Sequence, residues 1–167
     1  CQGYSEPNAG SDLANLALRA VRDGDDYILN GQKIWTSYAA ESDMIFVLTR
    51  TDSTQKKKQS GITFMVASLS TPGIEIRPIT QITDEAHFFE TFFTDARVPA
   101  ANVIGKEDEG WTLAKALLAH ERVATGSAEA YRDTLDRLVE LANSVNINGK
   151  PAIQNDQIRQ RVAQLFI

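Results

Sequence analysis

The sequence has few of the residues that form disulfides and metal sites. Cys1 is the single cysteine among 167 residues, so no disulfide can form within the chain. The two histidines, His87 and His120, have no second histidine or cysteine at the spacing of a zinc site. The composition therefore argues against a disulfide-stabilised secreted domain and a zinc module, and it agrees with a reducing compartment.

Long apolar runs and a basic surface are missing as well. No apolar stretch approaches the roughly 20 residues of a membrane-spanning helix. The net charge is −5, and the one lysine cluster, at residues 56–58, lies in a polar stretch, so nothing favours nucleic-acid binding. Hydrophobic residues make up 43% of the chain and charged residues 23%. These values predict a soluble globular protein with one good core or parts of two.

The two ends suggest a piece of a longer protein. The chain begins with Cys1 rather than methionine and stops at Ile167 inside an apolar helical pattern. No signal peptide can be judged from such a start. The sequence contains no internal repeat and no low-complexity segment.

Short strands are expected throughout the first 108 residues. Alternating or continuous apolar runs predict strands at 16–22, 27–29, 33–36, 44–49, 62–67, 74–77 and 87–94. Residues 23–26 form a turn signal. Asn30 and Gly31 predict a type I′ hairpin, because both residues tolerate positive φ. The polar stretch 51–60 predicts an exposed loop. Short strands without interleaved helices predict an antiparallel sandwich or barrel.

The hydrophobic period changes after Gly110. A 3-4-3-4 spacing predicts one long amphipathic helix, with a stripe formed by Ala114, Leu117, Glu121, Ala124, Ala128, Tyr131, Leu135, Leu138 and Ala142. Residues 143–149 break this helix, and a second helix begins at Gln154. The predicted fold is therefore α+β. An antiparallel β domain occupies residues 1–108, and the start of a helical bundle occupies residues 109–167.

The opening segment, residues 3–12, is rich in turn-forming residues. It holds two glycines, a proline, two serines and two carboxylates. Pro7 removes a backbone donor and Gly10 can adopt positive φ, so the segment cannot be a regular helix. Its N–H groups can point at a ligand. An ordinary surface turn is the alternative, because turns have the same composition.

Four ordered motifs resemble the acyl-CoA dehydrogenase flavoproteins. They are Ser-Glu-Pro-Asn-Ala-Gly-Ser-Asp at 5–12, Asn-Gly-Gln-Lys-Ile-Trp-Thr-Ser at 30–37, Phe-Phe-Thr-Asp-Ala-Arg-Val-Pro at 92–99, and Asn-Val-Ile-Gly at 102–105 with Glu-Gly-Trp at 109–111. The resemblance implies the family's middle β domain and the first helices of its C-terminal domain. It also implies FAD as cofactor, an acyl-CoA substrate, an electron-transfer flavoprotein as acceptor and an oligomeric full-length protein.

The resemblance assigns cofactor binding to two segments, Gln2, Gly3, Tyr4 and Ser5 in one and Trp35, Thr36 and Ser37 in the other. The hydroxyl and amide of Ser5 would face the flavin ring, Trp35 would pack against it, and the Ser37 hydroxyl would bond near its reactive nitrogen. Fixed N–H donors suit a flavin carbonyl that gains negative charge on reduction. Trp35 and Ser37 are two residues apart in a strand and should point the same way. A core role for Trp35 and a turn role for Ser5 are the alternatives.

The resemblance also suggests residues for the substrate. Ser11 would contact the CoA part, and Arg122 would lie near the substrate, with a solvated helix face as its alternative. Glu121 is the only charged residue in the helical stripe, and a carboxylate on a buried face is costly unless it is paired or functional. Burial would make it a stronger base, which suits removal of an α-proton. The long-chain and isovaleryl branches carry their catalytic glutamate at this position, whereas most branches carry it farther along. A structural ion pair is the alternative.

One stretch departs from the family pattern. Many members carry Arg-x-x-Phe-Gly between the first two C-terminal helices, and its arginine reaches the flavin of a neighbouring subunit. Residues 144–151 contain neither that arginine nor the phenylalanine. The resemblance therefore does not extend to this inter-subunit contact. A divergent branch with unusual substrates or a partner subunit is one interpretation.

The function implied by the resemblance is FAD-dependent α,β-dehydrogenation of an acyl-CoA thioester to trans-2-enoyl-CoA by the parent protein. The alternatives are an acyl-CoA oxidase and a non-catalytic flavin- or acyl-CoA-binding member. The piece itself is expected to be inactive and to bind FAD weakly or not at all. The expected location is the bacterial cytoplasm, or the mitochondrial matrix in a eukaryote.

Overall fold

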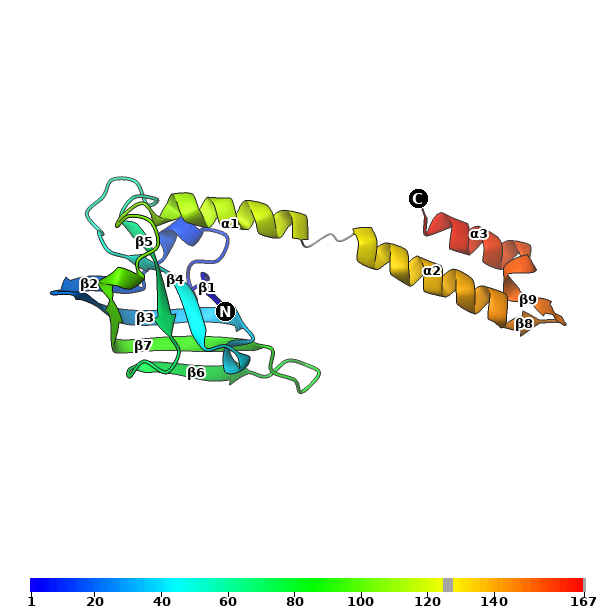
Figure 1. Ribbon diagram of the computed structural model, residues 1–167, viewed down its shortest axis with the longest axis horizontal. Helices are drawn as coiled ribbons and strands as arrows, with labels where there is room; N and C mark the ends of the chain where they lie inside the picture. Colours follow the sequence, from blue (N-terminus) through cyan, green and yellow to red (C-terminus); the bar gives the residue numbers. More distant parts are fainter. Residues whose placement is uncertain (125–127, 167) are drawn as a thin grey trace. The chain divides into compact units, whose positions relative to one another are not determined.

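The computed structural model describes residues 1–124 and 128–166. The chain divides into two compact units, Cys1–Leu118 and Ala119–Ile167. The first unit contains a large β-sheet and the beginning of one helix. The second contains two further helices joined through a small hairpin (Figure 1).

The first unit is built on one seven-stranded sheet. Its strands are β1 (Gln2–Gly3), β2 (Arg19–Asp23), β3 (Asp26–Ser37), β4 (Met44–Arg50), β5 (Ile62–Ser68), β6 (Ile74–Ile79) and β7 (Phe88–Pro99). The order is β1-β4-β2-β3-β7-β6, and β5 also pairs with β4.

The α+β class is confirmed, but the sheet is mixed rather than wholly antiparallel. Strand β4 pairs in parallel with β1 and with β2, whereas the other neighbours are antiparallel. The parallel pairs join strands that no hairpin connects, so local turn signals could not reveal them. Gly3 permits the close approach of β1, because a Cβ there would lie 2.8 Å from Val47 Cγ1.

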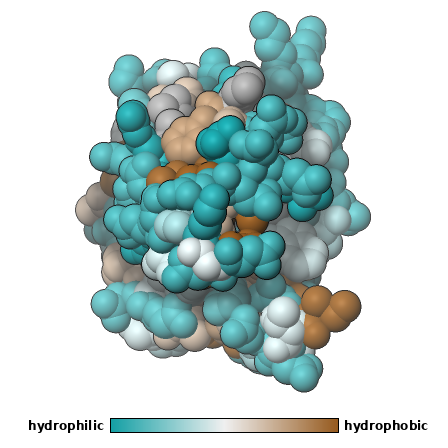
Figure 2. Space-filling view, turned by 90° about the vertical axis from the view of Figure 1, so that its right-hand side faces the viewer, coloured by the Kyte–Doolittle hydropathy of each residue, from teal (hydrophilic) through white to brown (hydrophobic). Residues whose placement is uncertain are grey.

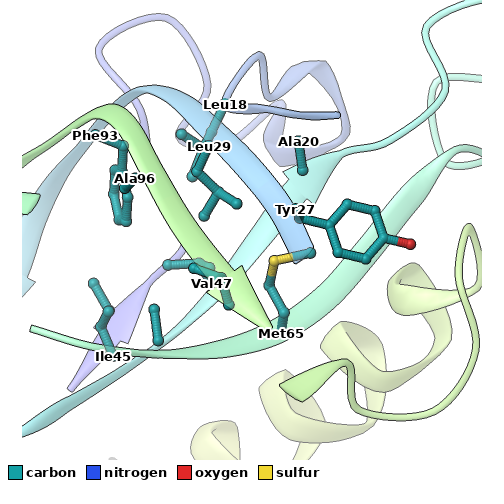
Figure 3. Packing of buried hydrophobic residues seen from close by; sticks show 11 residues of the cluster. Leu18, Ala20, Tyr27, Leu29, Ile45, Val47, Met65, Phe93 and Ala96 are labelled. Carbon is teal, nitrogen blue, oxygen red and sulfur yellow. The ribbon is translucent and has the colours of Figure 1, made fainter. Parts of the chain in front are cut away.

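The sheet has two parts, strands β2, β3 and β7 in one and strands β4 and β5 in the other, and both contribute side chains to one buried cluster (Figure 3). The cluster consists of Leu18, Ala20, Tyr27, Leu29, Ile45, Val47, Met65, Ala67, Phe93, Ala96 and Val98. Leu29 on β3 packs with Val47 on β4 and Met65 on β5, so strands from both parts turn their inner faces toward each other. Burying each such large side chain contributes about 1.5–3 kcal/mol. This packing is the face-to-face arrangement expected of a sandwich or barrel.

The hairpin predicted at Asn30 and Gly31 is wrong. Strand β3 runs through both residues as a single strand of 12 residues paired with β7. The register shifts between Leu29 and Gly31, where Gly31 has φ 146 and a Cβ would lie 3.0 Å from Leu18 Cα. Asn30 instead bonds across the sheet, since its Nδ2 donates to Asp95 Oδ1 at 3.0 Å and its Oδ1 accepts from Asp95 N at 3.0 Å. The dipeptide therefore continues the strand opposite a bulge of β7, where Thr94 and Asp95 together face Asn30 and Asp95 has φ 47.

Other turn and loop expectations hold. The turn at 23–26 joins β2 to β3, with Asp23 opposite Asp26 and Gly24 at φ 61. Residues 53–59 of the predicted loop are exposed.

The strand predicted at 16–22 begins later, at Arg19, because a short 3-10 helix over Leu13–Asn15 ends at Leu16.

Two helices are described in the region of the predicted long helix, α1 (Gly110–Ala124) and α2 (Ala128–Ser144). Residues 125–127, where that helix would be continuous, lie outside the described residues. The beginning of α1 belongs to the first unit, where Ala114 is buried against a second cluster that includes Tyr4, Leu48 and Phe64.

The second unit follows the predicted break. A hairpin of β8 (Asn146–Ile147) and β9 (Lys150–Pro151) leads to α3 (Asp156–Gln164). Asn148 and Gly149 have φ 54 and 78, so this second Asn-Gly pair makes the turn that the first does not. Ala142 on α2 and Val162 on α3 are buried, whereas Tyr131 of the predicted stripe is exposed.

The surface is mostly polar on the face shown in Figure 2, where apolar side chains appear in small groups. Within residues 1–124 and 128–166, no helix is long and apolar enough to cross a membrane.

Gly110 lies where α1 meets β5 and provides a test of this contact. A Cβ at Gly110 would lie 2.5 Å from Phe64 N and 2.7 Å from the Thr63 carbonyl carbon, which is backbone that cannot move aside. We expect Gly110→Ala to lower the free energy of unfolding by about 2 kcal/mol, as overpacking does. Urea unfolding measures this change.

The matched control is Gly10→Ala. A Cβ at Gly10 would meet nothing within 4 Å, so the expected change is below about 0.5 kcal/mol. Equal stabilities of the two variants would contradict the close packing of α1 on β5.

Candidate functional site

A buried ion pair holds the opening segment, residues 3–12, against β3. Lys33 Nζ lies 2.8 Å from Glu6 Oε1, and the two side chains are 0% and 7% exposed. Lys33 Nζ also donates to Tyr4 O at 3.1 Å, and Ile34 N donates to Ser5 O at 2.9 Å. Tyr4, Ser5 and Glu6 are therefore each bound to the same part of β3.

Glu6 also joins a third stretch of chain. Its Oε2 accepts from Ala17 N at 2.6 Å and its Oε1 from Leu18 N at 2.9 Å. The backbones of Glu6 and Ala9 exchange two hydrogen bonds of 3.0 Å, which close a tight turn around Pro7. A carboxylate with this many donors is well compensated for its burial.

Burial determines the electrostatics of this pair. Complete removal of Lys33 from water lowers its pKa from 10.5 to about 8, although the Glu6 carboxylate favours the charged form. The positive charge of Arg50 lowers the Lys33 pKa further. The ammonium is thus held in the folded protein by one carboxylate and one carbonyl.

Arg50 holds the neighbouring loop in place. Its guanidinium donates to Ala14 O at 2.7 Å, Lys58 O at 2.9 Å and Ser60 O at 2.8 Å. Burial lowers the pKa of Arg50, while nearby carboxylates oppose that change. The loop is also tied to the opening segment, because Lys58 Nζ lies 3.0 Å from Asp12 Oδ2.

Trp35 is both exposed and strained. It is 56% exposed and has φ 61, at a register shift of β3 against β7. The rings of Trp35 and Phe88 form a T-shaped pair whose centroids are 6.2 Å apart. A bulky residue at positive φ is an outlier, and such strain is concentrated at functional sites. Trp35 is thus not a core residue in the described chain.

The structure brings the two predicted cofactor segments together. The hydrogen bond from Ile34 N to Ser5 O places Ser5 beside the residue that precedes Trp35. Ser37 is exposed like Trp35, and Thr36 between them is buried, with its Oγ1 3.1 Å from Thr91 Oγ1. Trp35 and Ser37 can therefore both face a ligand, whereas the Thr36 side chain is taken up by the sheet.

The first predicted segment is mostly structural in its side chains. Gln2 and Ser5 are half-buried, Gly3 is buried, and Tyr4 packs edge-on against Phe46 at 5.8 Å. Gln2, Gly3 and Tyr4 are thereby committed to the sheet and the second core cluster. Ser5 is half-buried and is bound through its carbonyl oxygen to Ile34 N, next to Trp35.

The predicted substrate residues belong to different units of the chain. Ser11 is exposed in the first unit, next to the ion-paired Asp12. Glu121 and Arg122 lie on α1 in the second unit and are exposed. The expected burial of Glu121 is wrong for the chain described, because α1 buries residues of its first turns, such as Ala114, and leaves 119–122 exposed.

Sequence reasoning missed Glu6 and Lys33. The strand pattern assigns Lys33 no role beyond the strand at 33–36, and Glu6 falls within the predicted turn. The local pattern carried no clear signal, because Gly31 and Trp35, two residues to either side of Lys33, are exposed while Lys33 is buried. Which carboxylate it meets depends on the path of residues 3–12, and the local pattern does not contain that path.

The described residues offer no group of three or more histidine, cysteine, aspartate or glutamate side chains that could hold a metal ion.

Comparison with known families identifies the chain. The acyl-CoA dehydrogenase middle-domain model matches residues 1–113, and the acyl-CoA dehydrogenase C-terminal-domain model matches residues 108–167. The chain belongs to the acyl-CoA dehydrogenase family. The recognition made from the four motifs is confirmed.

Individual relatives agree with this assignment. Acyl-CoA dehydrogenase IpdE1 of Mycobacterium tuberculosis is 47% identical over 156 residues, which are 92% of this chain and 40% of the relative. The crystal structure of the ChsE4-ChsE5 complex from Mycobacterium tuberculosis matches 99% of this chain and 42% of that chain, with a TM-score of 0.84 and 36% identity. The Tcur3481-Tcur3483 steroid ACAD matches 98% of this chain and 41% of that one, with a TM-score of 0.83 and 32% identity. The chain thus spans about two fifths of the length of these relatives.

The buried lysine predicts that the free energy of unfolding rises with pH in the alkaline range, relative to a variant without this lysine. The folded pKa of Lys33 is about 8 and its ordinary value is 10.5. Between these values the unfolded chain binds more protons, so unfolding becomes less favourable as the pH rises, by up to about 1.4 kcal/mol per pH unit. We expect the wild type to gain stability over Glu6→Gln/Lys33→Met between pH 8 and pH 10.5.

Urea unfolding of both proteins at several pH values measures this gain. Other titrating groups cancel in the difference between the two proteins. A difference that stays constant across the window would contradict the lowered pKa of Lys33.

Proposed function

We propose that the full-length protein is an FAD-dependent acyl-CoA dehydrogenase that converts an acyl-CoA thioester to the trans-2-enoyl-CoA. Membership of the family supports this proposal. The observation that carries it is the hydrogen bond of 2.9 Å from Ile34 N to Ser5 O, which sets the Ser5 segment beside the exposed, strained Trp35. Two stretches of sequence that resemble the family's flavin-facing motifs thereby form one surface.

The residues on this surface fit a flavin. Trp35 offers an exposed aromatic ring for packing. The hydroxyls of Ser5 and Ser37 are hydrogen-bond donors on the same two segments, and the N–H of Ser5, whose preceding carbonyl is bound to Lys33, adds a further donor. Fixed donors stabilise charge that develops on a ring carbonyl or nitrogen, because they need no rearrangement during the reaction.

The chemistry divides between the cofactor and the chain. When bound, FAD supplies the acceptor for the hydride that leaves the β-carbon. The Glu121 carboxylate takes the proton from the α-carbon, so an O–H bond forms as the C–H bond breaks. Ser11 contacts the CoA part and Arg122 the region of the thioester. Because Glu121 is exposed in the chain described, this role requires the rest of the protein to cover it.

The partners follow from the same proposal. An electron-transfer flavoprotein accepts the electrons. The ChsE4-ChsE5 complex and the Tcur3481-Tcur3483 steroid ACAD are both named for two chains, and residues 144–151 lack the family's usual inter-subunit arginine. We therefore favour assembly with a partner subunit and a bulky steroid-derived acyl-CoA as substrate. We further propose a cytoplasmic or mitochondrial-matrix location. We also propose that the β domain ends at residue 108 and the helical domain begins at residue 109.

The test is a substrate panel on the full-length protein with any partner subunit it purifies with. We expect the protein to contain FAD and the flavin absorbance to bleach with one class among short-chain, long-chain and steroid side-chain acyl-CoAs. Turnover with a dye or an electron-transfer flavoprotein identifies a dehydrogenase, and oxygen consumption identifies an oxidase. A protein that binds FAD without bleaching on any member would favour a non-catalytic flavin-binding role.

Glu121→Gln tests the proposed base. Glutamine keeps the size of the side chain but cannot take the α-proton, so flavin reduction by substrate should slow by about 10²–10⁴-fold while FAD content stays unchanged. Stopped-flow absorbance measures the rate. Glu140→Gln, an exposed glutamate on α2, is the control and should retain the wild-type rate. A normal rate in Glu121→Gln would place the base elsewhere in the full-length protein.

A further inference from the structure

The ion pair of Glu6 and Lys33 contributes little net stability for the desolvation that it requires. Both side chains are almost completely removed from water, at 7% and 0% exposure. The desolvation of two charges offsets most of their attraction, and apolar residues of similar size are often as stabilising. What a buried pair adds is a single geometry, because its charges tolerate few other arrangements.

That geometry is imposed on the backbone of residues 4–6. Lys33 Nζ holds both Glu6 Oε1, at 2.8 Å, and Tyr4 O, at 3.1 Å. In a trans peptide the N–H points opposite to the preceding carbonyl oxygen. The Tyr4 carbonyl points toward Lys33, so the N–H of Ser5 points away from it.

The next peptide is held in the same way. Ser5 O accepts from Ile34 N at 2.9 Å, and Glu6 N donates to Ala9 O at 3.0 Å. Glu6 is also fixed from behind by Ala17 N and Leu18 N. Ser5 therefore lies between two peptide groups of fixed direction. On β3, the strained Trp35 is two residues away from Lys33.

We propose that Glu6 and Lys33 are positioning residues of the flavin site, which set the direction of the Ser5 amide and hydroxyl relative to Trp35. The inference rests on the proposed function, because it assigns a role toward FAD. Neither side chain touches the cofactor. Lys33 acts through the Tyr4 carbonyl, and Glu6 holds the Lys33 ammonium in place.

The test compares two neutralised ion pairs in the full-length protein. Glu6→Gln/Lys33→Met removes both buried charges together, keeps the side-chain lengths similar, and leaves one amide oxygen to accept from Leu18 N. The control, Glu75→Gln/Arg77→Met, removes an exposed pair of the same 2.8 Å length on β6. Wild-type FAD content and substrate bleaching are measured in parallel and test the proposed function separately.

Positioning predicts effects that a loss of stability alone would not produce. In the buried-pair variant we expect FAD to bind the apoprotein roughly tenfold more weakly and the flavin reduction potential to fall. Substrate reduction of the bound flavin should slow by about 10–100-fold with a smaller change in KM, as misplacement of an active-site group by about 1 Å does. Hydrogen exchange of the backbone at residues 4–6 should rise in the apoprotein. The exposed-pair variant should match the wild type in all four measurements.

Each outcome bears on the proposal. An active wild type together with a folded buried-pair variant of unchanged potential and rate overturns the positioning role and leaves the proposed function intact. A wild type that never holds FAD overturns both. If the buried-pair variant does not fold, Glu6→Asp withdraws the carboxylate by one methylene while keeping its charge. A lowered flavin potential in that variant supports the role, and an unchanged one overturns it.

Discussion

The contact between Glu6 and Lys33 is the constraint on which the candidate site depends. Residues 3–12 contain two glycines and a proline, and their local structure is limited to the end of β1 and the turn between Glu6 and Ala9, which does not by itself fix the path of the segment across the sheet. The buried ammonium of Lys33 supplies that path by binding one carboxylate and one carbonyl of the segment. The segment is thereby placed as accurately as the strand that carries the lysine.

The rest of the first unit supports that strand. β3 is paired along its length with β7, and Tyr27 and Leu29 of β3 belong to the buried core that it shares with β4, β5 and β7. The second cluster then connects the opening segment to α1 through Tyr4, Phe64 and Ala114. A single sheet therefore positions both the proposed cofactor surface and the base of the helix that leads toward Glu121. Catalytic groups held on rigid elements keep the geometry that the reaction needs.

The two Asn-Gly pairs show that distant strands decide a local turn signal: the hairpin was predicted at Asn30 and Gly31, but the turn forms at Asn148 and Gly149, within the predicted helix break at 143–149. The positive φ that both residues tolerate favours a type I′ turn at either pair. At Asn148 and Gly149 the flanking strands have two residues each and no other partner among the described strands, so the turn forms. At Asn30 and Gly31 the pairing with β7 and the hydrogen bonds to Asp95 extend the strand instead. Long-range pairing decided the outcome, and a single sequence does not display it.

The sequence by itself determined the α+β class, the positions of most strands, the helical periodicity after Gly110 and the family. Period, turn residues and ordered motifs are all local properties, which a linear pattern records. Only the tertiary structure decided the parallel pairs of β4, the register shifts between β3 and β7, the exposure of Glu121 and the meeting of Glu6 with Lys33. Each of these depends on which distant segments come together and on the water that they exclude. For the opening segment, composition predicted a turn that could bind a ligand, and the buried charge pair determined which way that turn faces.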